Sequence, residues 1–170
     1  MITIQAKEPQ LNIQDILGLE QSLLVKLPED YKNFLLKYNV AEPESNIYKR
    51  GEFGVSVRYF FGKSQKDYFD LIENNKTYHG RLPEKVLAIG EDSGGNLFCL
   101  NLKDESIWFW DHEGEAMEGE EVNLDNMTKL AQTLPEFLEA LELYQLTDLP
   151  PPDLKSIIYK KPGFDNKFKK

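Results

Sequence analysis

The sequence predicts an α+β fold, in which a central antiparallel β-sheet has N-terminal and C-terminal helices packed on it. Three short apolar runs, at residues 86–89, 97–102 and 107–110, are each bounded by Gly, Asn, Asp or Ser, which is typical of a meander of antiparallel strands. The middle run is apolar at consecutive positions, so we expect it at the centre of the sheet with other elements covering both of its faces. Apolar residues with helical spacing before and after the meander predict the helices.

Two helices are predicted ahead of the meander. Residues 1–10 show no clear period and predict a frayed end or an edge strand. A first helix is expected from Ile13, with Asn12 as its N-cap, because an Asn side chain accepts the free backbone N–H groups of a first turn. A second helix follows Pro28, which suits a first-turn position, and ends at Asn39. The apolar stripe of this second helix repeats at helical spacing in Tyr31, Phe34, Leu35 and Tyr38.

The segment between these helices and the meander predicts a loop, a strand and a helix. Residues 40–51 are polar and predict a loop. Residues 53–61 alternate in the period of two that marks a strand with one buried face. Ser64, with Asp67 three residues later, predicts the start of a helix through a weak form of the capping box. Residues 77–83 predict a loop.

Shorter elements are predicted after the meander. Residues 111–115 predict a charged turn, and residues 121–124 predict a short returning strand. The apolar positions within 127–131 predict a helical turn. Thr133 followed by Glu136 predicts the capping box of a final helix.

The chain length and a proline run define one domain and a tail. Three consecutive prolines at 150–152 cannot extend a helix, so we expect a domain over residues 1–148 and a Pro-rich linker with a basic C-terminal tail over 149–170. A chain of this size buries roughly 68–70% of its unfolded surface and needs no metal or disulfide to fold. The single cysteine, Cys99, lies in the middle apolar run and is predicted to be a small buried hydrophobe.

The charge distribution favours a basic partner. The formal net charge is −9, and residues 104–128 contain nine Asp or Glu and no Lys or Arg. Direct nucleic-acid binding needs clustered Lys and Arg, so this composition argues against it and favours cations or basic proteins. The chain begins without a basic segment followed by an apolar one, and no apolar run approaches the roughly 18 residues of a membrane span. We therefore expect a soluble, cytoplasmic protein that makes no membrane contact.

The motifs that suggest chemistry have simpler structural interpretations. Asp92-Ser93-Gly94 resembles the tripeptide of aspartic proteases, but that mechanism needs two carboxylates, and the Gly-Gly-Asn that follows predicts a hairpin turn. Asp111-His112-Glu113 with Glu115 offers one His on residues that alternate in direction, which favours a solvated turn over a metal site. Trp108 and Trp110 could form a platform for a sugar or a base, although a core or interface role is favoured. We expect no catalytic centre, no cofactor and no metal.

Four motifs occur in order: Leu27-Pro28-Glu29-Asp30-Tyr31-Lys32 with Phe34-Leu35 and Asn39; Leu82-Pro83-Glu84 leading to Ile89-Gly90-Glu91-Asp92-Ser93-Gly94-Gly95-Asn96; Trp108-Phe109-Trp110-Asp111-His112; and Phe137-Leu138. Through them the chain resembles the SMI1/KNR4 family, the SUKH superfamily of bacterial immunity proteins, over about residues 12–143. One departure is Val40, where the family commonly has Gly. The resemblance implies an antiparallel sheet with helices at its N- and C-terminal ends.

The resemblance also implies a non-enzymatic protein-binding domain. The first expectation is a bacterial immunity protein that neutralises a cognate polymorphic toxin, often a nuclease, by direct binding. The alternatives are a regulatory or scaffold module with a non-toxin protein partner, and a small-molecule or sugar binder. A basic toxin domain would complement the acidic surface. We expect the contact where acids flank turns at the ends of the central strands, with an indole as an apolar anchor: Glu91, Asp92, Trp110, Asp111, Glu113 and Glu115. The toxin's identity and the oligomeric state stay open.

Overall fold

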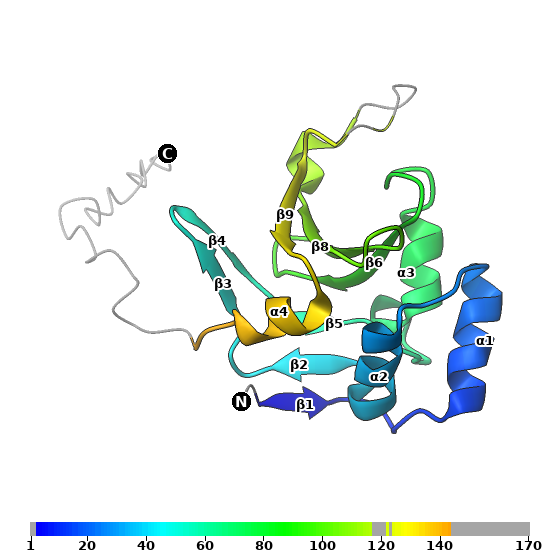
Figure 1. Cartoon of the computed structure of the whole chain (residues 1–170). Helices are drawn as coiled ribbons and strands as arrows, with labels where there is room; N and C mark the ends of the chain where they lie inside the picture. Colours follow the sequence, from blue (N-terminus) through cyan, green and yellow to red (C-terminus); the bar gives the residue numbers. More distant parts are fainter. Residues whose placement is uncertain (1–2, 117–121, 123, 144–170) are drawn as a thin grey trace, which may run out of the picture.

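A seven-stranded antiparallel sheet forms the centre of the fold (Figure 1). The computed structural model of the chain describes residues 3–116, 122 and 124–143. Along the sheet the strands are β1 (Ile4–Ala6), β2 (Ala41–Pro43), β5 (Tyr59–Phe60), β6 (Val86–Glu91), β7 (Leu97–Asn101), β8 (Ile107–Trp110) and β9 (Met127–Ala131). A separate hairpin pairs β3 (Ile47–Arg50) with β4 (Phe53–Ser56).

In the described part of the chain, helices lie between β1 and β2, between β5 and β6, and after β9. They are α1 (Ile13–Leu23), α2 (Glu29–Tyr38), α3 (Leu71–Thr77) and α4 (Leu134–Glu139), with short 3₁₀ turns at η1 (Asp67–Phe69) and η2 (His112–Gly114). The predicted α+β fold is confirmed. β1 is an edge strand, which was one of the two predictions for the first ten residues.

The predicted meander β6–β7–β8 is confirmed, and β7 lies in its middle. Residues 97–100 are at most 1% exposed. On one face of the sheet, Phe98 packs against Phe137 of α4 with ring centroids 5.5 Å apart. On the other face, Trp110 packs edge-on against Tyr78 at the end of α3, with centroids 5.7 Å apart. Both faces are therefore covered, which explains why this strand is apolar at consecutive positions.

Gly90 lets β5 approach β6 closely. The register of β6 against β7 shifts between Ala88 and Gly90, so one residue bulges out of the ladder. A Cβ atom on Gly90 would lie 2.7 Å from the carbonyl oxygen of Tyr59 and 3.2 Å from Cα of Phe60. No side chain fits in that space, so this position requires glycine.

The helix starts depend on side-chain caps. Asn12 Oδ1 accepts the N–H groups of Gln14 and Asp15, which confirms the predicted N-cap of α1. The helix predicted to start at Ser64 instead starts at Leu71. Asp70 Oδ1 accepts hydrogen bonds from the first turn of α3, while the Ser64 hydroxyl accepts the Lys66 N–H within a turn. The cap at Asp70, six residues further along the chain than Ser64, therefore replaced the predicted one.

Two predictions for the segment before the meander, one of a loop and one of a strand, were wrong. The predicted loop over residues 40–51 contains β2 and β3. The single strand predicted over 53–61 is two strands, because β4 pairs with β3 while β5 joins the large sheet. Alternation continues across the join, so the period alone does not reveal the change of partner.

The helical turn predicted over residues 127–131 is strand β9. The register shifts between Ile107 and Trp108, which pair with Ala131 and Lys129, so Leu130 is an extra residue opposite β8. This bulge produces the i, i+3, i+4 apolar spacing that imitates a helix. The linker and tail predicted over 149–170 lie outside the described residues, as do residues 121 and 123 of the strand predicted over 121–124. Among the described helices, none is long and apolar enough to cross a membrane.

Candidate partner-binding site

The predicted acidic site residues lie together at one end of the meander, on two neighbouring turns. One turn joins β6 to β7, and the other follows β8 through η2, at the top of Figure 1. Asn96 connects them, because its Oδ1 accepts the backbone N–H of His112 at 3.1 Å and lies 2.7 Å from His112 Nδ1. We call this surface the acidic margin; it consists of Glu91, Asp92, Asp111, Glu113 and Glu115.

Asp92 stabilises the first turn. Its Oδ1 accepts the N–H groups of Gly94 at 2.7 Å and Asn96 at 2.9 Å, and its Oδ2 accepts the Asn96 side-chain amide at 2.8 Å. Gly95 follows with a φ of 90°, a conformation that glycine adopts easily. The tripeptide that resembles a protease motif is therefore part of a hairpin turn, as predicted.

Glu91 lies at the end of β6 beside β5. Its Oε1 accepts the hydroxyl of Tyr59 at 2.5 Å and lies 3.4 Å from the guanidinium of Arg58. The side chain of Glu91 is 17% exposed. Burial, together with the neighbouring carboxylate, raises the pKa of Tyr59, so this phenol stays a neutral donor.

Asp111 and Glu113 form the second turn. Asp111 Oδ1 accepts the Glu113 N–H at 2.9 Å, which caps η2, and the Asp111 carbonyl accepts the Asn126 side-chain amide at 2.8 Å. Glu113 is exposed, and its carboxylate has no hydrogen-bond or ion-pair partner among the described residues. Glu113 is therefore the acid of the margin most available to a partner.

Glu115 pairs with an arginine that the sequence interpretation did not include. Arg81 Nε and Nη2 donate to its two carboxylate oxygens, each at 2.6 Å. Hydrogen bonding to Arg81 holds the pKa of Glu115 below its ordinary value. The guanidinium also lies over Tyr78 and Trp110, 4.8 and 5.6 Å from their ring centroids. One indication of a role for Arg81 was present in the sequence, because it is the only charged residue in the predicted loop 77–83.

Trp110 is not on the surface of this site. It is 1% exposed, because Tyr78 and Arg81 cover the face of the sheet to which it points. The prediction of this indole as a contact residue is therefore corrected: Trp110 supports the margin from beneath. Trp108 is part-buried, and its Nε1 donates to the Ser106 hydroxyl at 2.7 Å. One buried and one part-buried indole do not make an open platform for a sugar or a base.

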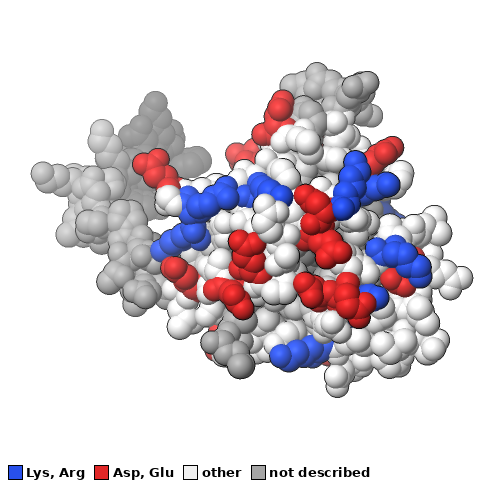
Figure 2. All heavy atoms as spheres, in the orientation of Figure 1, with Lys and Arg blue, Asp and Glu red and all other residues white. Residues whose placement is uncertain are grey.

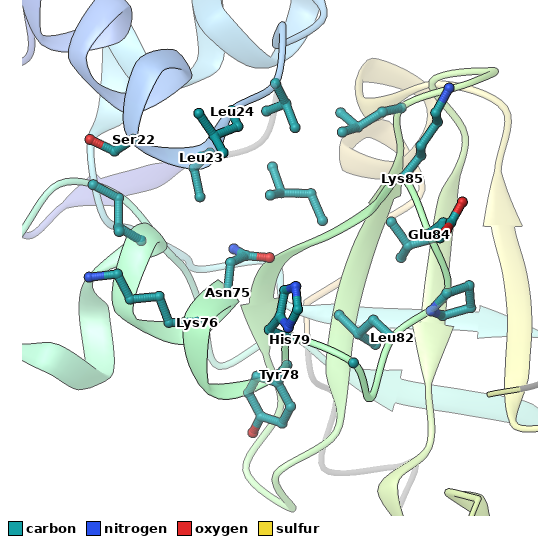
Figure 3. Close-up of a pocket in the computed structure, with 17 residues that line it drawn as sticks. Ser22, Leu23, Leu24, Asn75, Lys76, Tyr78, His79, Leu82, Glu84 and Lys85 are labelled. Carbon is teal, nitrogen blue, oxygen red and sulfur yellow. The ribbon is translucent and has the colours of Figure 1, made fainter. Parts of the chain in front are cut away.

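An open groove of about 860 Å³ lies on another part of the surface, and no residue of the acidic margin lines it (Figure 3). It runs between the C-terminal end of α1, α3 and residues 78–87, and its apolar lining comes from Leu23, Leu24, Val25, Ile72, Leu82, Val86, Leu87 and Leu102. The polar side chain of Asn75 in this groove is already engaged, because it bonds both the N–H and the carbonyl of Ala88 at 2.9 and 2.8 Å. In the described part of the chain, no group of three or more His, Cys, Asp or Glu could hold a metal ion.

The comparison with known proteins agrees with this architecture. Residues 10–140 match the SMI1 / KNR4 family (SUKH-1). The chain belongs to this family. The SUKH family is generally a non-enzymatic, immunity-type domain. An uncharacterised SPbeta prophage-derived protein of Bacillus subtilis strain 168, YokK, is 31% identical over 132 residues, which cover 65% of this chain and 68% of that relative. The family match includes the whole acidic margin.

Proposed function

We propose that this chain is a cytoplasmic immunity protein that neutralises a toxin protein by binding a basic surface of the toxin through the acidic margin, without catalysis. Membership of the SUKH family supports a protein partner. The observation that carries the proposal is the hydrogen bond accepted by Asn96 that joins the two acidic turns, because it holds the backbone that carries Asp111 and Glu113 at one end of the meander. Groups that are already ordered lose little conformational entropy when a partner binds.

The negative charge of the chain suits a basic partner, but charge alone does not identify which acidic region binds it. Figure 2 shows another gathering of acidic side chains over α2 and α4. The exposed acids of these two helices include Asp30 of α2 and Glu139 of α4. An experiment must therefore compare the two faces at equal change of charge.

The experiment pairs the chain with the basic C-terminal domain of any polymorphic toxin that is encoded beside its gene. Co-expression is expected to restore growth, and the purified proteins are expected to form a complex that weakens as salt rises. The margin variant combines Asp111→Asn, which keeps the Oδ1 acceptor, with Glu113→Lys. Its matched control combines Asp30→Asn with Glu139→Lys, which makes the same change of net charge.

We expect the margin variant to lose affinity by roughly threefold per unit charge at low salt, with a shallower salt dependence, while the control binds as the parent does. Melting curves of both variants check that folding is retained. A toxin whose effect is unchanged by the chain contradicts the immunity role. Equal loss in both variants, or loss only in the control, places the contact outside the acidic margin.

A further inference from the structure

The outer side of α1 is an apolar surface that the described part of the chain leaves uncovered. Ile13 is 60% exposed, Leu17 is 47% exposed and Leu24, directly after the helix, is 89% exposed. Ile13 and Leu17 lie at positions i and i+4 and therefore share one side of the helix, whereas Leu24 follows the helix and also lines the groove described above. α1 lies at the periphery of the molecule, and its other side faces α2 and α3 (Figure 1). Exposed apolar residues that gather on one helix face indicate an interaction surface.

This side of α1 also carries no charge. The other exposed residues of the helix are Gln14, Gly18, Gln21 and Ser22. Both acids of α1 have partners elsewhere, because Asp15 pairs with Lys63 at 2.6 Å and Glu20 is 6% exposed and accepts the Leu27 N–H at 2.9 Å. In Figure 2 the outer edge of the molecule at α1, on the right, is correspondingly white.

Gly18 has no packing partner among the residues that the structure describes. It lies inside a regular helix, where glycine is among the least favourable residues, and it does not have a positive φ. A Cβ atom at this position would meet nothing within 4 Å. The small residue therefore makes sense if another backbone approaches α1 from outside.

We propose that the outer face of α1 is a homodimer interface, covered by α1 of a second copy of this chain. Two copies that each carry a net charge of −9 repel one another, so they associate most readily through a face without charges. A basic partner gains nothing from such a face, whereas an identical copy matches it. The uncharged surface therefore selects a second copy over the basic toxin domain proposed above.

The helix surface is self-complementary. One ridge of side chains at a spacing of four residues consists of Ile13, Leu17 and Gln21. The adjacent row consists of Gln14, Gly18 and Ser22, and its small residues leave a shallow furrow beside the ridge. Ridges at this spacing pack into the grooves between the same ridges of another helix. A two-fold axis beside Leu17 and Gly18 then places each Leu17 over the Gly18 of the second copy, as an isologous interface requires. The η2 turn lies apart from α1 (Figure 1), so both acidic margins stay accessible in the dimer.

Sedimentation of the full chain from low micromolar to submillimolar concentration tests the proposal. We expect a reversible monomer–dimer equilibrium in the parent. Leu17→Glu introduces charge repulsion, and Gly18→Gln fills the furrow without changing charge; each is expected to raise the dimer dissociation constant about tenfold or more. The matched control is Leu124→Glu, which makes the same substitution at an apolar residue that is 57% exposed outside α1. The control is expected to dimerise as the parent does.

Circular dichroism at low concentration checks that the variants fold, and nuclear magnetic resonance of the parent gives a reading that needs no variant. Dilution of the parent is expected to shift amide resonances centred on residues 13–24. A parent that stays monomeric over the whole concentration range overturns the proposal. A dimer that persists in both Leu17→Glu and Gly18→Gln, or dilution shifts centred elsewhere, overturns it equally.

Discussion

The acidic margin and the outer face of α1 differ in how they present surface to a partner. In the margin, most carboxylates already accept hydrogen bonds within the chain, and Glu113 is the exposed exception among the described residues. On α1 the charged side chains have partners elsewhere, so the exposed surface is apolar or amide. The margin therefore presents carboxylates on turns that hydrogen bonds hold in place, whereas α1 presents an uncharged, largely apolar surface.

This difference separates two kinds of recognition. Oriented charge favours an unlike partner of opposite sign and raises the rate of encounter. An uncharged, self-complementary face favours binding of an identical copy, because the negative net charge of two copies makes them repel one another when charged faces meet. Under the two proposals made above, the chain makes two contacts that do not compete for the same surface. The predictions below test how strongly each surface depends on its local structure.

The largest difference is expected between two glycines. Gly90→Ala is expected to lower the free energy of unfolding by about 3 kcal/mol, because the new Cβ lies 2.7 Å from the Tyr59 carbonyl oxygen, within the backbone of β5. Gly18→Ala is expected to raise it by about 1 kcal/mol, because the helix gains a better former and the Cβ meets nothing. Urea unfolding of both variants at low protein concentration measures the two effects. Equal destabilisation would contradict the open position of Gly18.

A smaller effect is expected at the turn of the margin. Asp92→Ala removes the acceptor of three hydrogen bonds, so we expect unfolding to become easier by about 1–2 kcal/mol. Asp92→Asn keeps Oδ1 as an acceptor for the two backbone N–H groups and is expected to lose less. Urea unfolding of the pair gives the comparison. An alanine variant as stable as the parent would show that the carboxylate does not hold the turn.

The sequence predicted the parts of the margin that depend on local chemistry. The apolar runs bounded by turn residues gave the meander, and Asp92 with the glycines that follow gave its hairpin. Both signals act within a few residues and need no knowledge of distant partners. The caps at Asn12 and Thr133 were predicted for the same reason.

What the sequence did not show depended on contacts between distant segments. Trp110 was expected at the surface, but it is covered by Tyr78 and Arg81, which come from another part of the chain. β9 was mistaken for a helical turn because a bulge changed its period, and the bulge exists only against β8. Likewise, helical spacing predicted α1 but did not reveal that Leu17 would remain exposed. Burial is decided by what packs on an element, so periodicity alone cannot assign it.

The smallest effect is expected at the Arg81–Glu115 pair, and it depends on pH. Arg81 lowers the pKa of Glu115 in the folded chain below its ordinary value of 4.5. A carboxyl with a lowered folded-state pKa stabilises the fold above its unfolded pKa, and this contribution is lost as the pH falls through the folded pKa. Glu115→Gln should therefore lower the free energy of unfolding at neutral pH, by less than about 1 kcal/mol because both side chains are partly exposed.

The difference between parent and Glu115→Gln should then shrink as the pH falls below 4.5, because the parent's own carboxyl becomes protonated and neutral. Urea unfolding over a pH series measures both curves. Glu113→Gln is the matched control on the same turn, and since no described residue bonds its carboxylate, its unfolding free energy at neutral pH should stay within about 0.5 kcal/mol of the parent. A difference at Glu115 that stays constant across the series would show that the amide disturbs the packing of Arg81 over Tyr78 and Trp110, and that the charge of the pair contributes nothing measurable.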